Sequence, residues 1–126
     1  MQILMAIAAG GAIGAVLRHF VNSGAMHLLG GDYPWGIFII NILGSFAMGC
    51  LAAFSAHIYE PPQLLKAFLA VGVLGGFTTF SAFSLDAALL WERGDPMAAF
   101  LYAMGSVVLA IGGLFAGMAL IRAVAA

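Results

Sequence analysis

Charged side chains are scarce in this sequence: Lys and Arg number 4, and Asp and Glu 5, among 126 residues. A soluble domain normally has about a quarter of its residues charged, so this chain cannot coat a water-exposed fold of its size. The formal net charge is −1 and no basic cluster is present. This balance argues against nucleic acid or an anionic surface as a partner.

Cysteine and metal-ligand patterns are also nearly absent. Cys50 is the single cysteine and lies in an apolar run, so it is expected to be a small buried hydrophobic residue. The three histidines, His19, His27 and His57, show no metal-ligand spacing. No nucleotide loop and no nucleophile–base pair is recognisable, so the sequence predicts no enzyme activity. The first apolar segment has no basic residue before it and is expected to be a retained helix rather than a signal peptide.

Long apolar segments fill most of the chain: 64% of residues are hydrophobic, and the mean hydropathy is +1.13. Turn and charge signals cluster only at residues 30–34, 60–63 and 92–96. The segments between them have the length needed to cross a bilayer. The sequence therefore predicts an all-α membrane protein with a single domain over residues 1–126. Its four transmembrane helices are expected at about 3–29, 34–58, 63–91 and 96–123.

The basic residues are distributed almost evenly between the two ends of the spans. Four spans put both termini and the 58–63 loop on one side, with Lys66 and Arg122 near it. Arg93 lies near the other side, and Arg18 falls inside the first span. Lys and Arg near span ends set orientation, so this balance gives almost no bias. We expect insertion in both orientations and an antiparallel, dual-topology homodimer.

Small residues recur four apart along the spans, which is the spacing that lets helices approach closely in lipid. The pairs are Gly10 and Gly14, Ser45 and Gly49, and Gly113 and Gly117. Packing within one chain and packing across a dimer both remain open for them.

Polar side chains inside a span are costly, so each one suggests a role. Gly10, Gly14, Arg18 and Asn22 are spaced by four and share one stripe of the first helix. Arg18 is either a cation that draws an anion into a wet vestibule, or an arginine that snorkels or caps a neighbouring helix end. Asn41, in the second span, either donates to an anion or bridges two helices.

The third span carries the strongest local signal, in residues 75–84. Gly75 and Gly76 followed by the β-branched Thr78 and Thr79 disfavour a continuous helix, which predicts a break in mid-membrane. Backbone groups freed by a break are tolerated only inside protein or beside water, where they can coordinate ions.

Aromatic and hydroxyl side chains alternate after this break. Phe77, Phe80 and Phe83 recur every three residues among Thr79, Ser81 and Ser84. A phenylalanine stripe usually means packing, but its mixture with hydroxyls favours a pore lining. The ring edge carries the positive part of the quadrupole and so favours a small anion.

Two further polar positions lie in the third and fourth spans. Tyr102 and Ser106, one turn apart, either extend the donor track or form a hydrogen bond between helices. Asp86 lies near the Trp91 end of its span, which favours an interfacial or paired position over a proton-coupling site.

Over nearly its whole length the chain resembles the Fluc (CrcB) family of microbial fluoride channels. Residues 75–84 are the most specific match. The supporting positions are Gly14 to Arg18 in the first span, and Gly36, Asn41, Gly44, Phe46 and Gly49 in the second. Two departures stand out: Ile37 occupies a position where threonine is expected, and Ala82 one where a second threonine is frequent.

The resemblance implies an antiparallel dimer in a bacterial plasma membrane, with two fluoride pathways lined by both subunits. It implies that Phe80 and Phe83 face fluoride and that Asn41 is the pore amide donor. The other implied pathway residues are hydroxyl-bearing: Thr79, Ser81, Ser84, Tyr102 and Ser106. It also implies a structural sodium ion on the dimer axis, bound by the carbonyls of Gly75 and Thr78 of both subunits.

The expected function is therefore passive, selective export of fluoride from the cytoplasm. One alternative is a proton-coupled transporter of the small multidrug-resistance type, which needs a carboxylate in its first helix where this chain has Arg18. Another alternative is a structural subunit of a larger membrane complex.

Overall fold

The computed structural model describes residues 1–126, which form helices joined by short turns. The first two spans are α1, Gln2–Leu29, and α2, Trp35–His57. The third consists of α3, Gln63–Lys66, the π-helix η1, Ala67–Leu74, α4, Gly75–Phe77, and α5, Phe80–Glu92. The fourth is α6, Pro96–Ala125.

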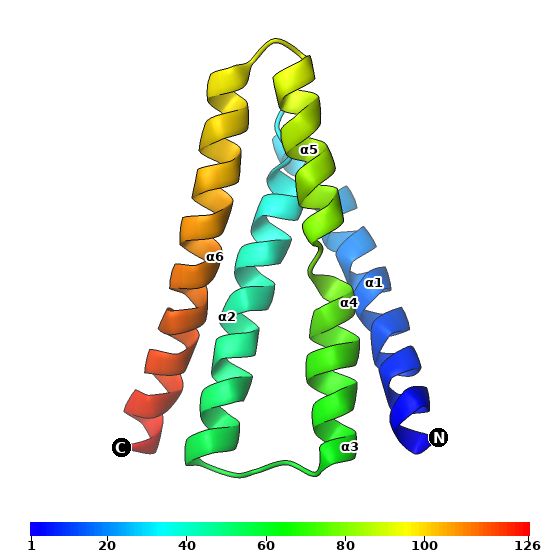
Figure 1. Ribbon diagram of the computed structural model, residues 1–126, viewed down its shortest axis with the longest axis vertical. Helices are drawn as coiled ribbons and strands as arrows, with labels where there is room; N and C mark the ends of the chain where they lie inside the picture. The colour runs from blue at the N-terminus through cyan, green and yellow to red at the C-terminus, as the bar shows by residue number, and fades with distance from the viewer.

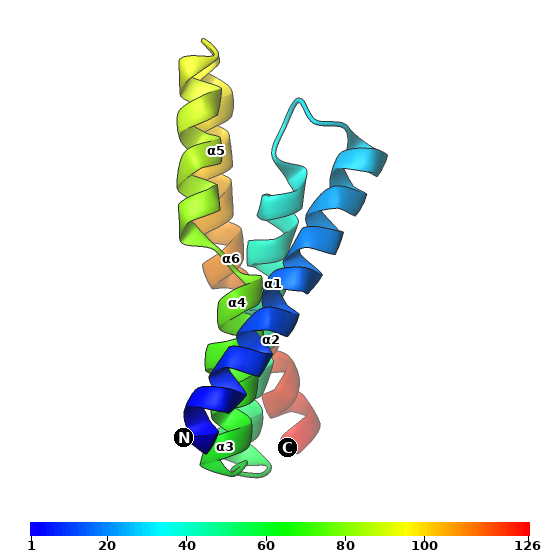
Figure 2. The same cartoon turned by 90° about the vertical axis from the view of Figure 1, so that its right-hand side faces the viewer.

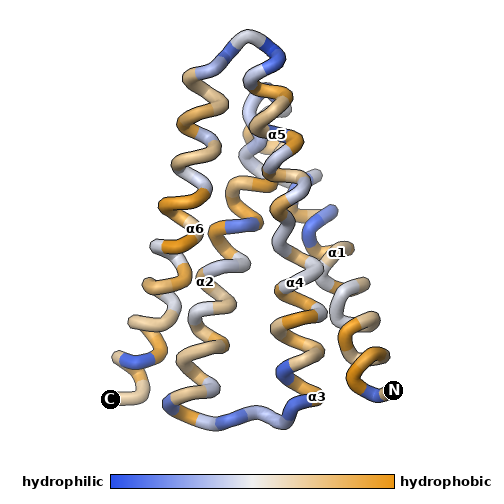
Figure 3. Tube along the Cα trace, in the orientation of Figure 1, coloured by the Kyte–Doolittle hydropathy of each residue, from blue (hydrophilic) through white to orange (hydrophobic).

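Four helical segments are long and apolar enough to cross a membrane. They are Gln2–Leu29, Trp35–His57, Gln63–Glu92 and Pro96–Ala125, within a few residues of the predicted bounds. The prediction of an all-helical, multi-pass membrane protein is confirmed. Hydrophilic colours in Figure 3 gather mainly at the turns and the chain ends, while most of each helix is apolar.

The chain ends and the turns divide between the two ends of the molecule. Figure 1 shows both termini and the α2–α3 connection at one end, and the α5–α6 turn at the other. Near that second end, the α5–α6 hairpin and the α1–α2 hairpin diverge as two arms (Figure 2).

Glycines bring the helices into close contact where the two arms meet. A Cβ on Gly72 of η1 would lie 2.8 Å from the Cα of Gly10 on α1, and a Cβ on Gly76 would lie 2.7 Å from the Gly11 carbonyl oxygen. Gly14 likewise packs against the Val73 carbonyl. A larger side chain at these positions would push α1 away from the third span. These small residues therefore serve packing within one chain.

The second contact of this kind joins α2 and α6, which run side by side in the same direction (Figure 1). Gly49 packs against Leu114, and Gly117 packs against Phe46 and Cys50. A Cβ on Gly113 would lie 3.4 Å from the Ile42 carbonyl oxygen.

The α5 part of the third span is sparsely covered. Leu90 is the only buried residue of α5, and Phe80, at its first position, is 71% exposed. Ser81 and Ser84 are also exposed on this helix. Hydroxyl groups facing hydrocarbon are unfavourable, so this face of α5 suits a protein partner better than lipid.

Candidate functional site

The helical conformation of the third span is interrupted at Thr78 and Thr79. Thr78 has φ −82° and ψ 156°, and Thr79 has φ −153° and ψ 119°, both extended. The Thr79 side chain then caps α5, because its Oγ1 accepts a hydrogen bond from the Ala82 N–H at 3.1 Å. Thr78 Oγ1 donates back to the Leu74 carbonyl at 3.0 Å. The two threonines thus end one helix and begin the next.

Asn41 satisfies the backbone of this interruption from α2. Its Nδ2 donates to the Thr79 carbonyl at 3.1 Å, and the Thr79 N–H donates to its Oδ1 at 2.9 Å. A primary amide carries two N–H donors, so one N–H of Asn41 remains for a further acceptor. Asn41 therefore bridges two helices, one of the two roles that the sequence left open, and keeps one N–H without a partner.

Arg18 reaches the same interruption from α1. Its Nη1 donates to the Thr78 carbonyl at 3.4 Å, a long contact. The side chain also lines a cavity of about 570 Å³, here called the Arg18 cavity. Its lining residues are Ala15, Arg18, His19, Asn22, Ile37, Thr79, Ser81, Ala82 and Leu85. Arg18 thus combines a helix-end contact with a place beside a polar cavity.

A second cavity, of about 270 Å³, is also lined by Thr79 and is here called the Asn41 cavity. It is lined by Asn41, Ser45, Thr78, Thr79, Phe80, Phe83, Ser106, Val107 and Ala110. Residues of α2, the third span and α6 meet there. The cavity therefore brings together five of the residues expected to line a fluoride pathway: Phe80, Phe83, Asn41, Thr79 and Ser106.

The two phenylalanines of this cavity stand edge to face. The ring centroids of Phe80 and Phe83 are 5.4 Å apart with an interplanar angle of 62°. Phe83 also packs against Tyr102, with centroids 5.4 Å apart. Tyr102 is fully buried, and its hydroxyl donates to Asp86 Oδ2 at 3.3 Å. The paired position expected for Asp86 is therefore present, and the Tyr102 hydroxyl has a partner within the chain.

The remaining predicted hydroxyls lie apart from the Asn41 cavity. Ser81 lines the Arg18 cavity and lies 3.3 Å from Thr79 Oγ1. Ser84 donates to the Phe80 carbonyl of its own helix at 2.9 Å. A serine hydroxyl that is bonded to its own helix is less free to bind an ion, so Ser84 is the weakest candidate for ion binding among the predicted residues.

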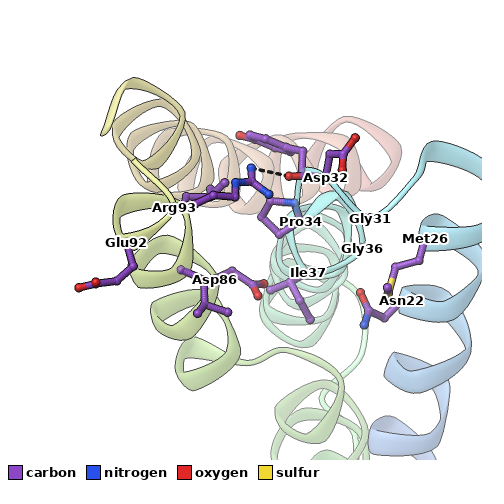
Figure 4. Close-up of a pocket in the computed structure, with 13 residues that line it drawn as sticks. Asn22, Met26, Gly31, Asp32, Pro34, Gly36, Ile37, Asp86, Glu92 and Arg93 are labelled. Carbon is purple, nitrogen blue, oxygen red and sulfur yellow. Dashed lines mark hydrogen bonds between the residues drawn. The ribbon is translucent and has the colours of Figure 1, made fainter. Parts of the chain in front are cut away.

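A third cavity, of about 510 Å³, opens between the two arms and is here called the loop-end cavity (Figure 4). Arg93 Nη2 donates to the Asp32 carbonyl at 2.6 Å and ties the α5–α6 turn to the α1–α2 loop. Burial raises the pKa of Tyr33 in that loop above its ordinary value. Asp86 and Ile37 both line this cavity (Figure 4).

The loop-end cavity shares lining residues with the Arg18 cavity, which in turn shares one with the Asn41 cavity. Asn22 and Ile37 line both the loop-end cavity and the Arg18 cavity, and Thr79 lines both the Arg18 and the Asn41 cavities. Asn22 was not predicted from the sequence as a residue of the site. The only sequence feature that pointed to Asn22 was its position four residues after Arg18, on the same stripe of the first helix.

The carbonyls of Gly75 and Thr78 have lost their usual helical donors. The Thr79 N–H, which would bond Gly75 in a helix, donates to Asn41, and the Ala82 N–H donates to Thr79 Oγ1 instead of the Thr78 carbonyl. Gly75 is also exposed. Free carbonyl oxygens are the ligands that hard cations prefer, so this donor set fits sodium. Arg18 beside Thr78 takes up part of that capacity.

Comparison with known proteins identifies relatives over nearly the full chain. Residues 5–118 match the family described as CrcB-like protein, Camphor Resistance (CrcB). A protein of Rhodospirillum centenum is 57% identical over 122 residues, 97% of each chain, and one of Rhodopseudomonas palustris is 54% identical over 91% of this chain and 93% of its own. A relative in Caulobacter vibrioides is 47% identical over 98% of each chain. All three are named fluoride-specific ion channel FluC, and the chain belongs to the CrcB family.

Proposed function

We propose that this protein is a fluoride-selective ion channel of a bacterial plasma membrane, through which fluoride leaves the cytoplasm passively. The observation that carries the proposal is the Asn41 cavity, where Phe80, Phe83, Asn41 and Ser106 meet from three spans. Relatives that cover at least nine-tenths of this chain have the name fluoride-specific ion channel. An ion channel of this kind is not an enzyme.

The chemistry of the Asn41 cavity suits a small, strongly hydrated anion. A hydroxyl and a free amide N–H replace water as donors without adding a fixed positive charge. The edges of Phe80 and Phe83 add weak attraction at a place where no cation would trap the ion. Several weak sites in series permit both entry and release, which a channel requires.

The first stage of the pathway in this proposal is the Arg18 cavity. The guanidinium attracts an anion into water, and Thr79 and Ser81 provide hydroxyls on the way to the Asn41 cavity. Ile37, where the family resemblance leads one to expect threonine, lines this stage and makes its wall apolar. Fluoride would keep more of its water there than in the Asn41 cavity.

The proposal includes an antiparallel homodimer with two pathways, each lined by both subunits. The support is the uncovered face of α5, where Phe80 is 71% exposed beside the exposed Ser81. A second copy would cover these groups and complete the wall of the Asn41 cavity. The near balance of basic residues at the two ends allows either orientation. A C-terminal tag should be accessible from both sides of the membrane, and access from one side only would refute opposite insertion.

A structural sodium ion on the dimer axis completes the proposal. The residues that would hold it are Gly75 and Thr78, through carbonyl oxygens without helical donors. Such an ion would coordinate these free carbonyl oxygens and offset their partial negative charge. In this proposal Arg18 contacts the Thr78 carbonyl directly, and Asn41 holds the backbone of the neighbouring Thr79.

The decisive experiment compares fluoride and chloride efflux from liposomes that contain the purified protein. Fluoride should leave rapidly while chloride stays inside. Fluoride release no faster than from protein-free vesicles would refute the channel. A proton-coupled drug transporter is disfavoured because α1 contains no Asp or Glu. A structural subunit would instead give no ion flux and would purify with a fixed partner.

A further inference from the structure

Ser106 is the one buried side-chain polar group without a partner. Its Oγ is inaccessible and has no hydrogen bond, and the residue is only 4% exposed. Ser55 and Ser84 behave differently, because each donates to the carbonyl four residues earlier, at 2.9 Å. A buried hydroxyl without a partner is costly, so Ser106 is available for a ligand in the Asn41 cavity that it lines.

Ser45 lines the same cavity from α2, and its hydroxyl, like that of Ser106, forms no hydrogen bond within the chain, although Ser45 is only half-buried. It follows Asn41 by four residues, so the two side chains lie on one face of α2, one turn apart. In contrast to Ser55 on the same helix, its hydroxyl is not taken by the helix backbone.

The register of α2 and α6 arranges these donors along one line. Gly113 lies against Ile42 and Phe46, and Gly117, one turn later, against Phe46 and Cys50. The two helices therefore run parallel with a constant register, and Ser106 lies about one helical turn before Asn41 along their common direction. Beyond Ser106, α6 carries Ala110, which also lines the cavity but has no donor. The polar line thus passes from α6 to α2.

We propose that Ser45 is a further anion-binding residue, whose hydroxyl donates to fluoride beyond Asn41, at a depth where α6 offers no donor. The proposal rests on the proposed function and extends it. Fluoride would pass from the Ser106 hydroxyl to the free N–H of Asn41 and then to Ser45. Each donor would take over from the one before it as the ion advances.

The test compares Ser45→Ala with Ser55→Ala in the liposome efflux assay. Both substitutions remove one hydroxyl from a half-buried position on α2, and alanine keeps the small size that packing needs. Loss of a hydrogen bond to a charged group predicts about tenfold slower fluoride efflux in Ser45→Ala. Ser55→Ala should match the wild type, and chloride retention should be unchanged in both.

A second variant, Ser45→Cys, keeps the size and weakens the donor, so its efflux should lie between those of Ser45→Ala and the wild type. Wild-type efflux in Ser45→Ala overturns the assignment of Ser45 while leaving the channel proposal intact. If Ser45→Ala is not recovered as a monodisperse protein, wild-type efflux in Ser45→Cys overturns it equally. Absence of fluoride efflux from the wild type itself would instead refute the proposed function.

Discussion

Asn41 and Thr79 join the second and third spans by two hydrogen bonds of opposite direction. Asn41 Nδ2 donates to the Thr79 carbonyl at 3.1 Å, and the Thr79 N–H donates to Asn41 Oδ1 at 2.9 Å. One side chain thereby satisfies both backbone groups of a residue that has left the helix. In lipid no water replaces these bonds, so the interruption depends on this amide.

Asn41→Ala should destabilise the protein, because it leaves the N–H of Thr79 without a partner. Each unsatisfied buried group costs about 1–3 kcal/mol, which predicts a clear fall in the thermal unfolding midpoint in detergent. Asn22→Ala is the matched control, since the Asn22 side chain lines two cavities but forms no hydrogen bond within the chain. Equal midpoints for the two variants would contradict the bridging role of Asn41.

Gly10→Ala should disrupt the packing of α1 on the third span. A Cβ at Gly10 would meet the Phe68 carbonyl and would lie 2.9 Å from the Cα of Gly72, and backbone on both sides leaves little room to adjust. Overpacking of this kind costs about 1–3 kcal/mol. Gly11→Ala is the control on the neighbouring residue, because nothing lies within 4 Å of its added Cβ. Unfolding in detergent should separate the two variants, and similar stability would argue against close packing at Gly10.

Hydropathy and turn residues were sufficient to predict the four spans, because membrane-spanning length depends on local composition alone. The residues that leave the helix, Thr78 and Thr79, lie within the run that the sequence singled out. The π-helical winding of Ala67–Leu74 was not predicted. No local sequence pattern indicates this winding. Gly72 in this segment packs against Gly10 of α1, a helix that is distant in the sequence.

The candidate site was predictable in composition but not in connectivity. Asn41 and Thr79 are 38 residues apart, so no spacing rule indicates that they bond. The predicted Ser84 donates instead to its own helix, whereas Ser45, read as a packing residue, lines the cavity. Which serine bonds its own backbone depends on rotamer and neighbours, and the sequence gives neither.

Phe80→Ile and Phe83→Ile should each slow fluoride efflux at least tenfold. Isoleucine keeps an apolar surface in the Asn41 cavity but has no ring edge to attract the anion. Phe115→Ile is the control, because Phe115 is 63% exposed on α6 and lies outside the three cavities. Near-normal efflux in both Phe80→Ile and Phe83→Ile would overturn the role of the rings in the pathway.

Arg18→Gln should strengthen sodium binding at the proposed axial site. The guanidinium lies 3.4 Å from the Thr78 carbonyl oxygen, so it repels a cation on that oxygen by about 2–3 kcal/mol at an effective dielectric constant near 20. Sodium that binds only the folded protein raises the unfolding midpoint as its concentration increases. In Arg18→Gln this rise should begin at a sodium concentration at least tenfold lower than in the wild type. N-methylglucamine, which is too large for the site, should have no such effect on either protein. If sodium and N-methylglucamine shift the unfolding midpoint equally in both proteins, the proposed sodium site is refuted. If the sodium dependence of the midpoint is the same in Arg18→Gln as in the wild type, repulsion by Arg18 is refuted.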